Sequence, residues 1–443
     1  MTRQGKTGLL IWFVLGLGSE LQILASMSMT ELFCYIAAPF LFFRQFAQMK
    51  RDGLAMLFGL SVLVVVGCGV SCAVNRSPSY AVLRGFATSV LLPCAVIVGH
   101  WLIRKNANGF KWFLVGWVLS LFIQTFAFQA QSLTVRYGTE SLSASDYAGS
   151  VLYWITRGGA LATLLSKGWY LHTPLLLDVG LPCAVGVLFA VKSVSGRSAA
   201  LGIFGFAALA ILGGKTQQTM RRIGRHFVLF MMIGLVSIVA AKSLYSYAAS
   251  RGLLGEDQYK KYEMQTKSGS DLLDLLMGGR KEFFVGLGAC LDRPITGFGP
   301  WAMDAGGYYA RFIMKHGTEE DIASLMKAMR NPSEKAMLLQ AHSHLIQFWH
   351  WFGLAGLVFW IYVIYVLMRY VKQDCWVVPQ WYAWLTCALP ALFWNIFFSP
   401  FQSRFAVMLL ITACLMARAV RKGTFVLPLD MQEEIIENER KRA

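Results

Sequence analysis

Long apolar blocks alternate with short polar gaps along most of the chain. The blocks lie at about 8–25, 29–46, 54–73, 81–102, 111–129, 173–191, 199–213, 226–246, 343–368, 377–398 and 403–420. A membrane-spanning helix needs about 20 mainly apolar residues, and backbone polar groups in lipid must bond within their own segment. Apolar residues make up 56% of the chain and charged residues only 15%. The pattern predicts an all-α polytopic membrane protein.

Basic residues concentrate in five of the gaps and orient the spans. Short cytoplasmic loops are rich in Lys and Arg, so these gaps and both termini are expected in the cytoplasm. The gaps at 130–150 and 192–198 then both lie outside, yet only one apolar block, 173–191, lies between them. The chain must therefore cross the membrane a second time between these gaps, and 151–168 is the candidate. This gives about twelve spans. The five gaps also explain the net charge of +17, so nucleic acid is not an expected partner. Their basic residues are Arg44, Lys50 and Arg51; Arg104, Lys105 and Lys111; Lys215, Arg221, Arg222 and Arg225; Arg369 and Lys372; Arg418, Arg421 and Lys422.

One polar segment, 247–341, is much longer than the others and divides the chain. Residues 1–246 would form transmembrane helices 1–9, 247–341 an outer loop domain, 342–420 transmembrane helices 10–12, and 421–443 a cytoplasmic tail. Apolar residues at three- and four-residue spacing predict amphipathic helices at 272–290 and 322–340. Glycine and proline between them predict turns at 293–301. Only one of the nine cysteines, Cys290, lies in this loop, which excludes a disulfide within it.

The signatures of soluble enzymes are absent. The chain has no phosphate-cradling glycine loop with its lysine, no Cys or His pair at metal spacing, and no serine-centred elbow. No cofactor or metal is therefore expected. The gaps that face outward instead hold Arg197, Arg280 and His342. Guanidinium groups grip phosphate oxygens in pairs, and an imidazole can remove a proton from a hydroxyl group.

Each of these residues also has a structural interpretation. Arg197 alone is typical of an interfacial side chain that reaches toward water, Arg280 of a solvated helix charge, and His342 of a hydrogen-bonding residue at a helix end. His344 and His350 are interpreted as structural. Three further charged residues fall within predicted spans, where they would line a cavity or pair internally: Arg84, Arg157 and Asp178. The residues alone indicate a membrane protein with an outward cationic site.

Three segments together resemble bacterial O-antigen ligases. His342-Ser343, nine residues, and then Gly353-Leu-Ala-Gly356 is similar to the histidine signature of that family. The segment around Gly196-Arg197 resembles its arginine turn between two spans, although the family usually has Ser-Arg there. Gly279-Arg280, followed by Pro294-Ile-Thr-Gly-Phe-Gly299, resembles its Gly-Arg and Pro-x-x-Gly-x-Gly elements. An aromatic residue expected after Arg280 is Phe283 or Phe284 rather than tryptophan.

The resemblance implies transfer of a polysaccharide from undecaprenyl diphosphate to a sugar hydroxyl of lipid A-core, at the periplasmic face of the bacterial inner membrane. Arg197 and Arg280 would hold the diphosphate and His342 would act as general base, with Arg293 and Ser343 as further substrate contacts. Diphosphate is a ready leaving group, so neither ATP nor metal is required, and direct attack would invert the anomeric carbon. An O-antigen polymerase and a protein O-oligosaccharyltransferase remain as alternatives. A lipid or solute transporter is disfavoured because the chain shows no inverted repeat.

Overall fold

The computed structural model describes a large part of the chain, and all structural statements below refer to that part. It comprises residues 3–19, 21–24, 27–127, 247–248, 251, 281–304, 306–316, 322–323, 325–326, 339, 343–374, 377–378, 381, 389, 392–393, 395–397, 401, 404–428 and 432. The spans expected at 151–168, 173–191, 199–213 and 226–246 lie outside these residues. So does most of the helix expected at 322–340.

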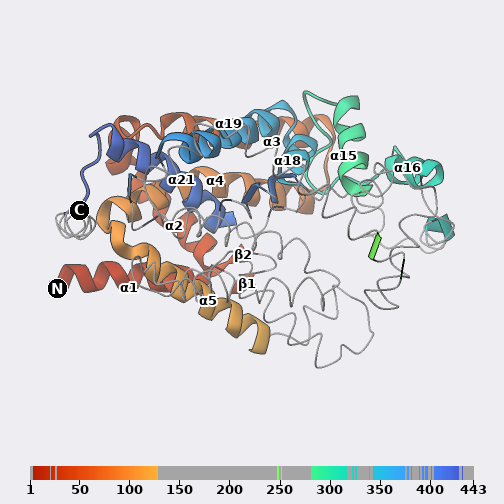
Figure 1. Ribbon diagram of the computed structural model, residues 1–443. Coiled ribbons are helices and arrows are strands. Elements are labelled where there is room, and N and C mark those ends of the chain that lie inside the picture. The colour runs from red at the N-terminus through yellow and green to blue at the C-terminus, as the bar shows by residue number, and fades with distance from the viewer. Residues whose placement is uncertain are drawn as a thin grey trace.

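A bundle of long helices forms the main body (Figure 1). Helix α4 lies at its centre and packs against α2, α3 and α21, while α1 packs against α5 and α19 against α3. Among the described residues, three segments are long and apolar enough to cross a membrane: Ala55–Val74, Ser79–Lys105 and Leu354–Asp374. The helices of the bundle are α1 (Arg3–Gly18), α2 (Met29–Arg51), α3 (Ala55–Val74), α4 (Ser79–Lys105), α5 (Phe110–Ala127), α19 (Leu354–Arg369) and α21 (Arg404–Arg421).

The bundle has an apolar core, but it also exposes many large apolar side chains on its surface. Large apolar side chains face outward, with Phe43 87% exposed, Phe40 77% exposed and Leu83 74% exposed. Polar groups lie inside, among them Glu31 and His100. Helices surrounded by lipid keep apolar side chains on the outside and place charged groups in the interior. The chain is therefore a helical membrane protein.

Two predicted spans differ in the structure. The first was expected at 8–25, but α1 ends at Gly18 and a short antiparallel hairpin follows, formed by β1 (Gln22–Leu24) and β2 (Met27–Ser28). The hairpin ends where Ser28 caps α2: the Ser28 hydroxyl accepts from the Glu31 backbone N–H, and the Glu31 carboxylate accepts from that of Ser28. This capping box stops α2 from continuing backward.

The prediction of one uninterrupted span at 343–368 is also wrong. Two helices occupy this segment, α18 (His344–Phe352) and α19, and Gly353 separates them with φ 62° and ψ −146°. Only glycine adopts this combination readily. Helix α19 continues into a π-helical turn, Tyr370–Asp374. The candidate membrane span therefore begins at Leu354, and α18 precedes it.

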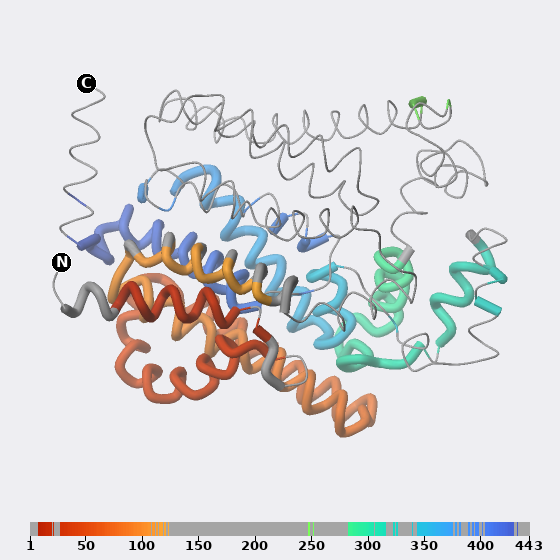
Figure 2. The backbone as a smooth tube through the Cα atoms, turned by 90° about the horizontal axis from the view of Figure 1, so that it is seen from below, coloured from red at the N-terminus to blue at the C-terminus, as the bar shows by residue number. Residues whose placement is uncertain are grey.

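Two helices of the outer loop are described along their length. Helix α15 (Lys281–Asp292) confirms the helix expected at 272–290 over the residues described, and α16 (Tyr308–His316) follows it. Both lie at the end of the bundle opposite the start of α1 and the end of α21 (Figures 1 and 2). A short 3-10 helix, Ala107–Gly109, joins α4 to α5 at the other end.

The two ends of the bundle differ in their chemistry. At the end that we call the basic end, Arg104 contacts Asp52 and Arg421 contacts Asp374. The opposite end, which we call the loop end, contains Asn75, the turn at 293–301, Ser343 and the start of α21. Segments predicted to share a side of the membrane therefore lie at one end of the bundle, within the part that the structure describes.

Candidate functional site

The predicted site residues fall only partly within the described structure. Arg293 and Ser343 are described, whereas Arg197, Arg280 and His342 lie outside the described residues. Helix α15 begins directly after Arg280 in the sequence, and Ser343 directly follows His342. The contacts of α15 and Ser343 therefore place the segments that follow Arg280 and His342.

The helices that follow Arg280 and His342 pack against each other. Cys290 of α15 and Ile346 of α18 are both buried, and Phe283, Leu345 and Trp349 surround them. The Cys290 thiol donates to the carbonyl oxygen of Ile346 at 3.7 Å. Burial raises the pKa of Cys290 to about 12, so the thiol stays protonated at neutral pH and is a packing group rather than a nucleophile.

The turn at 293–301 inserts into the break between α18 and α19. The Leu354 N–H donates to the carbonyl oxygen of Ile295 at 2.9 Å, and the Trp349 indole N–H donates to that of Pro294 at 2.9 Å. A Cβ atom at Gly353 would lie only 1.9 Å from the Ile295 oxygen. The glycine of the histidine signature is therefore required both by its backbone angles and by the close approach of this turn.

Asn75, at the end of α3, fixes the same turn from the other side. Its side-chain amide donates to the carbonyl oxygens of Gly297 at 3.1 Å and of Ser71 at 2.8 Å. Its Oδ1 accepts from Arg293 Nη1 at 2.6 Å. The sequence analysis did not single out Asn75, because an asparagine after an apolar block is ordinary for a helix end. Only the fold brings it beside a loop that lies over 200 residues away.

Ser343 has a structural role in the described part of the site. Its hydroxyl is fully buried, accepts from the Ile346 N–H at 3.1 Å as the cap of α18, and donates to the Ile396 carbonyl oxygen at 2.7 Å. These bonds hold the start of α18 against the segment before α21. The predicted contact of Ser343 with substrate stays a prediction.

His344 and His350 are packed among aromatic rings. His344 lies 5.0 Å from the Trp360 ring and 5.1 Å from the Phe401 ring. His350 stacks on Phe298 at 5.2 Å, and neither of its ring nitrogens has a hydrogen-bond partner. Complete burial lowers the pKa of His350 to about 3, so it stays neutral. Both positions agree with the structural interpretation of these two histidines.

Two buried ionic clusters were not predicted from the sequence. At the loop end, Arg404 lies 3.7 Å from the Glu31 carboxylate and donates to the Thr88 hydroxyl at 3.3 Å. The sequence indicates only the position of Glu31, through the Ser-x-x-Glu pattern at the start of α2.

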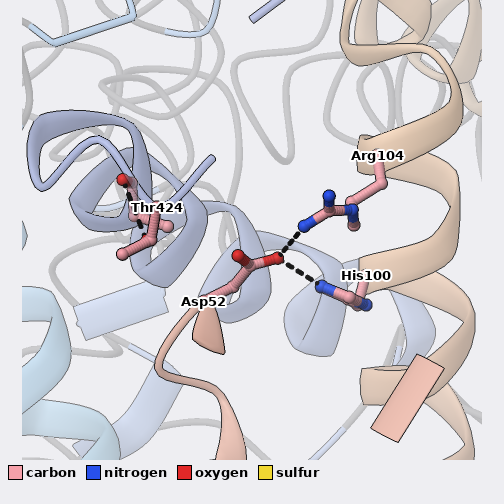
Figure 3. Close-up of polar contacts among 5 residues, drawn as sticks. Asp52, His100, Arg104 and Thr424 are labelled. Carbon is pink, nitrogen blue, oxygen red and sulfur yellow. Dashed lines mark hydrogen bonds and ion pairs between the residues drawn. The ribbon is translucent and has the colours of Figure 1, made fainter. Parts of the chain in front are cut away.

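The second cluster lies at the basic end (Figure 3). A hydrogen bond of 2.8 Å joins His100 Nε2 to Asp52 Oδ2, and Arg104 Nη1 donates to the same oxygen at 2.5 Å. Asp52 and His100 are fully buried side chains, and the Arg104 guanidinium carbon lies 5.4 Å from the centre of the Phe425 ring. This cluster joins the α2–α3 turn to α4. It lies at the end of the bundle away from the predicted site.

Among the residues that the structure describes, no three His, Cys, Asp or Glu side chains lie together in a way that could hold a metal ion. No protein-family model matches the chain, and no curated protein matches it.

Proposed function

We propose that the protein is a membrane glycosyltransferase that moves a polysaccharide from undecaprenyl diphosphate to a sugar hydroxyl of lipid A-core. The observation that carries this proposal is the hydrogen bond between Ile295 and Leu354. It joins the Pro-x-x-Gly-x-Gly element to the residue that follows Gly353 in the histidine signature. Two segments that resemble O-antigen ligases separately in the sequence thus lie together at one end of the bundle, which supports a shared site.

The proposed site faces the periplasm of a bacterial inner membrane. The basic end of the bundle carries Arg104, Arg421 and Lys422 near Asp52 and Asp374, and the positive-inside rule favours the cytoplasm for such an end. The loop end then faces outward. The proposed topology has about twelve spans. It places the loop at 247–341 outside and both termini in the cytoplasm.

In the proposed reaction the acceptor hydroxyl attacks the anomeric carbon and the bond to the diphosphate breaks. His342 removes the hydroxyl proton, and Arg197 and Arg280 stabilise the negative charge that develops on the diphosphate. Attack from the opposite side inverts the configuration at that carbon. Neither ATP nor a metal ion takes part, because the energy resides in the diphosphate linkage of the donor.

The direct test uses purified protein with the lipid-linked polysaccharide and lipid A-core. We expect a new glycolipid whose mass equals acceptor plus polymer, and undiminished transfer in the presence of a chelator. The His342→Ala and Arg280→Ala variants should lose transfer while still inserting in membranes. Arg311→Ala, which removes an exposed arginine of α16, is the matched control and should retain it. Wild-type turnover in either site variant refutes the assigned roles.

The related activities share the donor and differ in the acceptor. A polymerase would extend the lipid-linked polymer itself, and a protein O-oligosaccharyltransferase would modify protein hydroxyls. In a deletion strain, the proposal predicts lipid A-core without polymer while long chains accumulate on the lipid carrier. Absence of those long chains would favour the polymerase.

A further inference from the structure

Two arginines lie over aromatic rings of the same turn at the loop end. The Arg293 guanidinium carbon lies 4.8 Å from the centre of the Phe298 ring. The Arg84 guanidinium carbon lies 5.9 Å from the centre of the Trp301 ring. The two rings are three residues apart in one turn, although Arg84 belongs to α4 and Arg293 follows α15. Stacking on a ring orients a guanidinium group and leaves its in-plane N–H donors available.

The turn that carries the rings is held rigidly. Phe298 donates its N–H to the His350 carbonyl oxygen at 2.7 Å and stacks on the His350 ring. Trp301 packs on Trp351 at 4.2 Å. Trp301 also has a φ of 51°, a conformation that bulky residues adopt only when the surrounding structure imposes it. Strain of this kind is common at functional sites.

Within the described residues, neither arginine forms an ion pair with a carboxylate. Three other arginines of the bundle are ion-paired, Arg104 with Asp52, Arg404 with Glu31 and Arg421 with Asp374, whereas Arg369 donates to the Tyr365 hydroxyl. Arg293 instead contacts the neutral Asn75 amide, and no ion pair joins Arg84 to a described acidic residue. The turn therefore presents two positive charges that an external anion can approach.

The surroundings indicate that this anion belongs to a lipid. Ile295, two residues from Arg293, is 72% exposed, and Leu83, next to Arg84, is 74% exposed. Tyr80, one turn before Arg84, is 46% exposed, as is typical of aromatic residues at a membrane interface. Positive charge beside exposed apolar side chains suits a molecule with a phosphate headgroup and an apolar tail.

We infer that Arg84 and Arg293, seated on Trp301 and Phe298, form a binding site for the phosphate groups of a lipid. This inference rests on the proposed function, because it specifies the substrate contact made by Arg293 and adds Arg84 to it. Asn75 is a positioning residue, since its Oδ1 fixes the Arg293 guanidinium. The shared chemistry is a lipid phosphate, which the diphosphate donor and a phosphorylated acceptor both provide.

The test measures binding rather than transfer. Full-length protein in nanodiscs of neutral lipid is titrated with undecaprenyl diphosphate without sugar, with phosphorylated lipid A, and with dephosphorylated lipid A. The Arg84→Gln/Arg293→Gln variant should bind at least one phosphorylated lipid about a hundredfold more weakly, since each charge-assisted bond contributes about tenfold. The lipid whose binding falls identifies the source of the phosphate. Dephosphorylated lipid A should bind equally to the variant and the wild type.

Arg311→Gln is the matched control, because Arg311 also lies over an aromatic ring, at 4.8 Å from Tyr308, but on α16. It should bind like the wild type. Undiminished binding of both phosphorylated lipids by the double variant, or an equal loss in Arg311→Gln, overturns the inference. If the double variant does not fold, the wild type alone tests the inference. Its affinity for the phosphorylated lipid must fall as the salt concentration is raised. An affinity that does not change with salt overturns the inference.

These results separate the inference from the proposed function. Binding that depends on both arginines, in a protein that transfers no sugar under any condition, would leave the inference standing and refute the glycosyltransferase. Transfer that proceeds at the wild-type rate in the double variant would refute the inference and leave the glycosyltransferase standing.

Discussion

Gly353→Ala perturbs the joint that connects the turn at 293–301 to the bundle. The substitution places a Cβ atom 1.9 Å from the Ile295 carbonyl oxygen, which forces the turn away and breaks the 2.9 Å bond from Leu354. It also puts alanine at φ 62° and ψ −146°, which costs about 1–3 kcal/mol. The lost hydrogen bond adds about 1 kcal/mol. We therefore expect Gly353→Ala to reduce the free energy of unfolding by about 2–4 kcal/mol.

This effect is measured by thermal unfolding in detergent, with the remaining monomeric protein as the readout. Gly288→Ala is the control, because Gly288 lies in α15 with no atom within 4 Å of an added Cβ; it should stabilise the protein by about 0.5–1 kcal/mol. The melting temperature of Gly353→Ala should fall by several degrees and that of Gly288→Ala should not. A melting temperature for Gly353→Ala equal to that of the wild type would show that the turn does not dock in this break.

Three further substitutions test the buried polar groups. His350→Phe should keep or raise the free energy of unfolding by up to about 1 kcal/mol, because the imidazole nitrogens have no partners; a loss above about 2 kcal/mol would contradict this. With a folded-state pKa of about 3, below the ordinary value of about 6.5, His350 makes the wild type lose stability as pH falls from about 6.5 toward 3. His350→Phe should lack that component in an acid titration. Ser343→Ala should cost about 1–2 kcal/mol by thermal unfolding, and a cost below about 0.5 kcal/mol would argue against the cap. Asp52→Ala should cost about 3 kcal/mol because it removes the acceptor that the buried His100 and the partly buried Arg104 share, whereas the exposed control Asp292→Ala should cost under about 1 kcal/mol.

The helices of the bundle were predictable because lipid imposes one requirement on every span. Blocks at 54–73 and 81–102 correspond closely to α3 and α4, since about 20 apolar residues with satisfied backbone groups can form little else in a bilayer. The break at Gly353 was not predicted. An apolar block with glycine inside it is compatible with a continuous helix, and only the contact with Ile295, 58 residues earlier in the sequence, requires the break.

The sequence located two segments of the candidate site, whereas the roles of Arg197, Arg280 and His342 stay predictions. The sequence motif marked the turn after Arg293 and the glycine at 353, and the structure brings these two segments together. The roles of Asn75 and Arg84 depend on contacts between residues over 200 positions apart, which no local pattern records. Ser343 shows the opposite case. Its place in the motif predicts a substrate contact, while its two hydrogen bonds show a helix cap.

The transfer reaction itself is the most direct measurement of the central claim. Purified wild-type protein, supplied with polysaccharide on undecaprenyl diphosphate and with lipid A-core, should produce the polymer-bearing glycolipid without ATP and in the presence of a chelator. His342→Ala should produce none, although it inserts in membranes and melts like the wild type. Absence of product from folded wild-type protein, or full product from His342→Ala, would contradict the account.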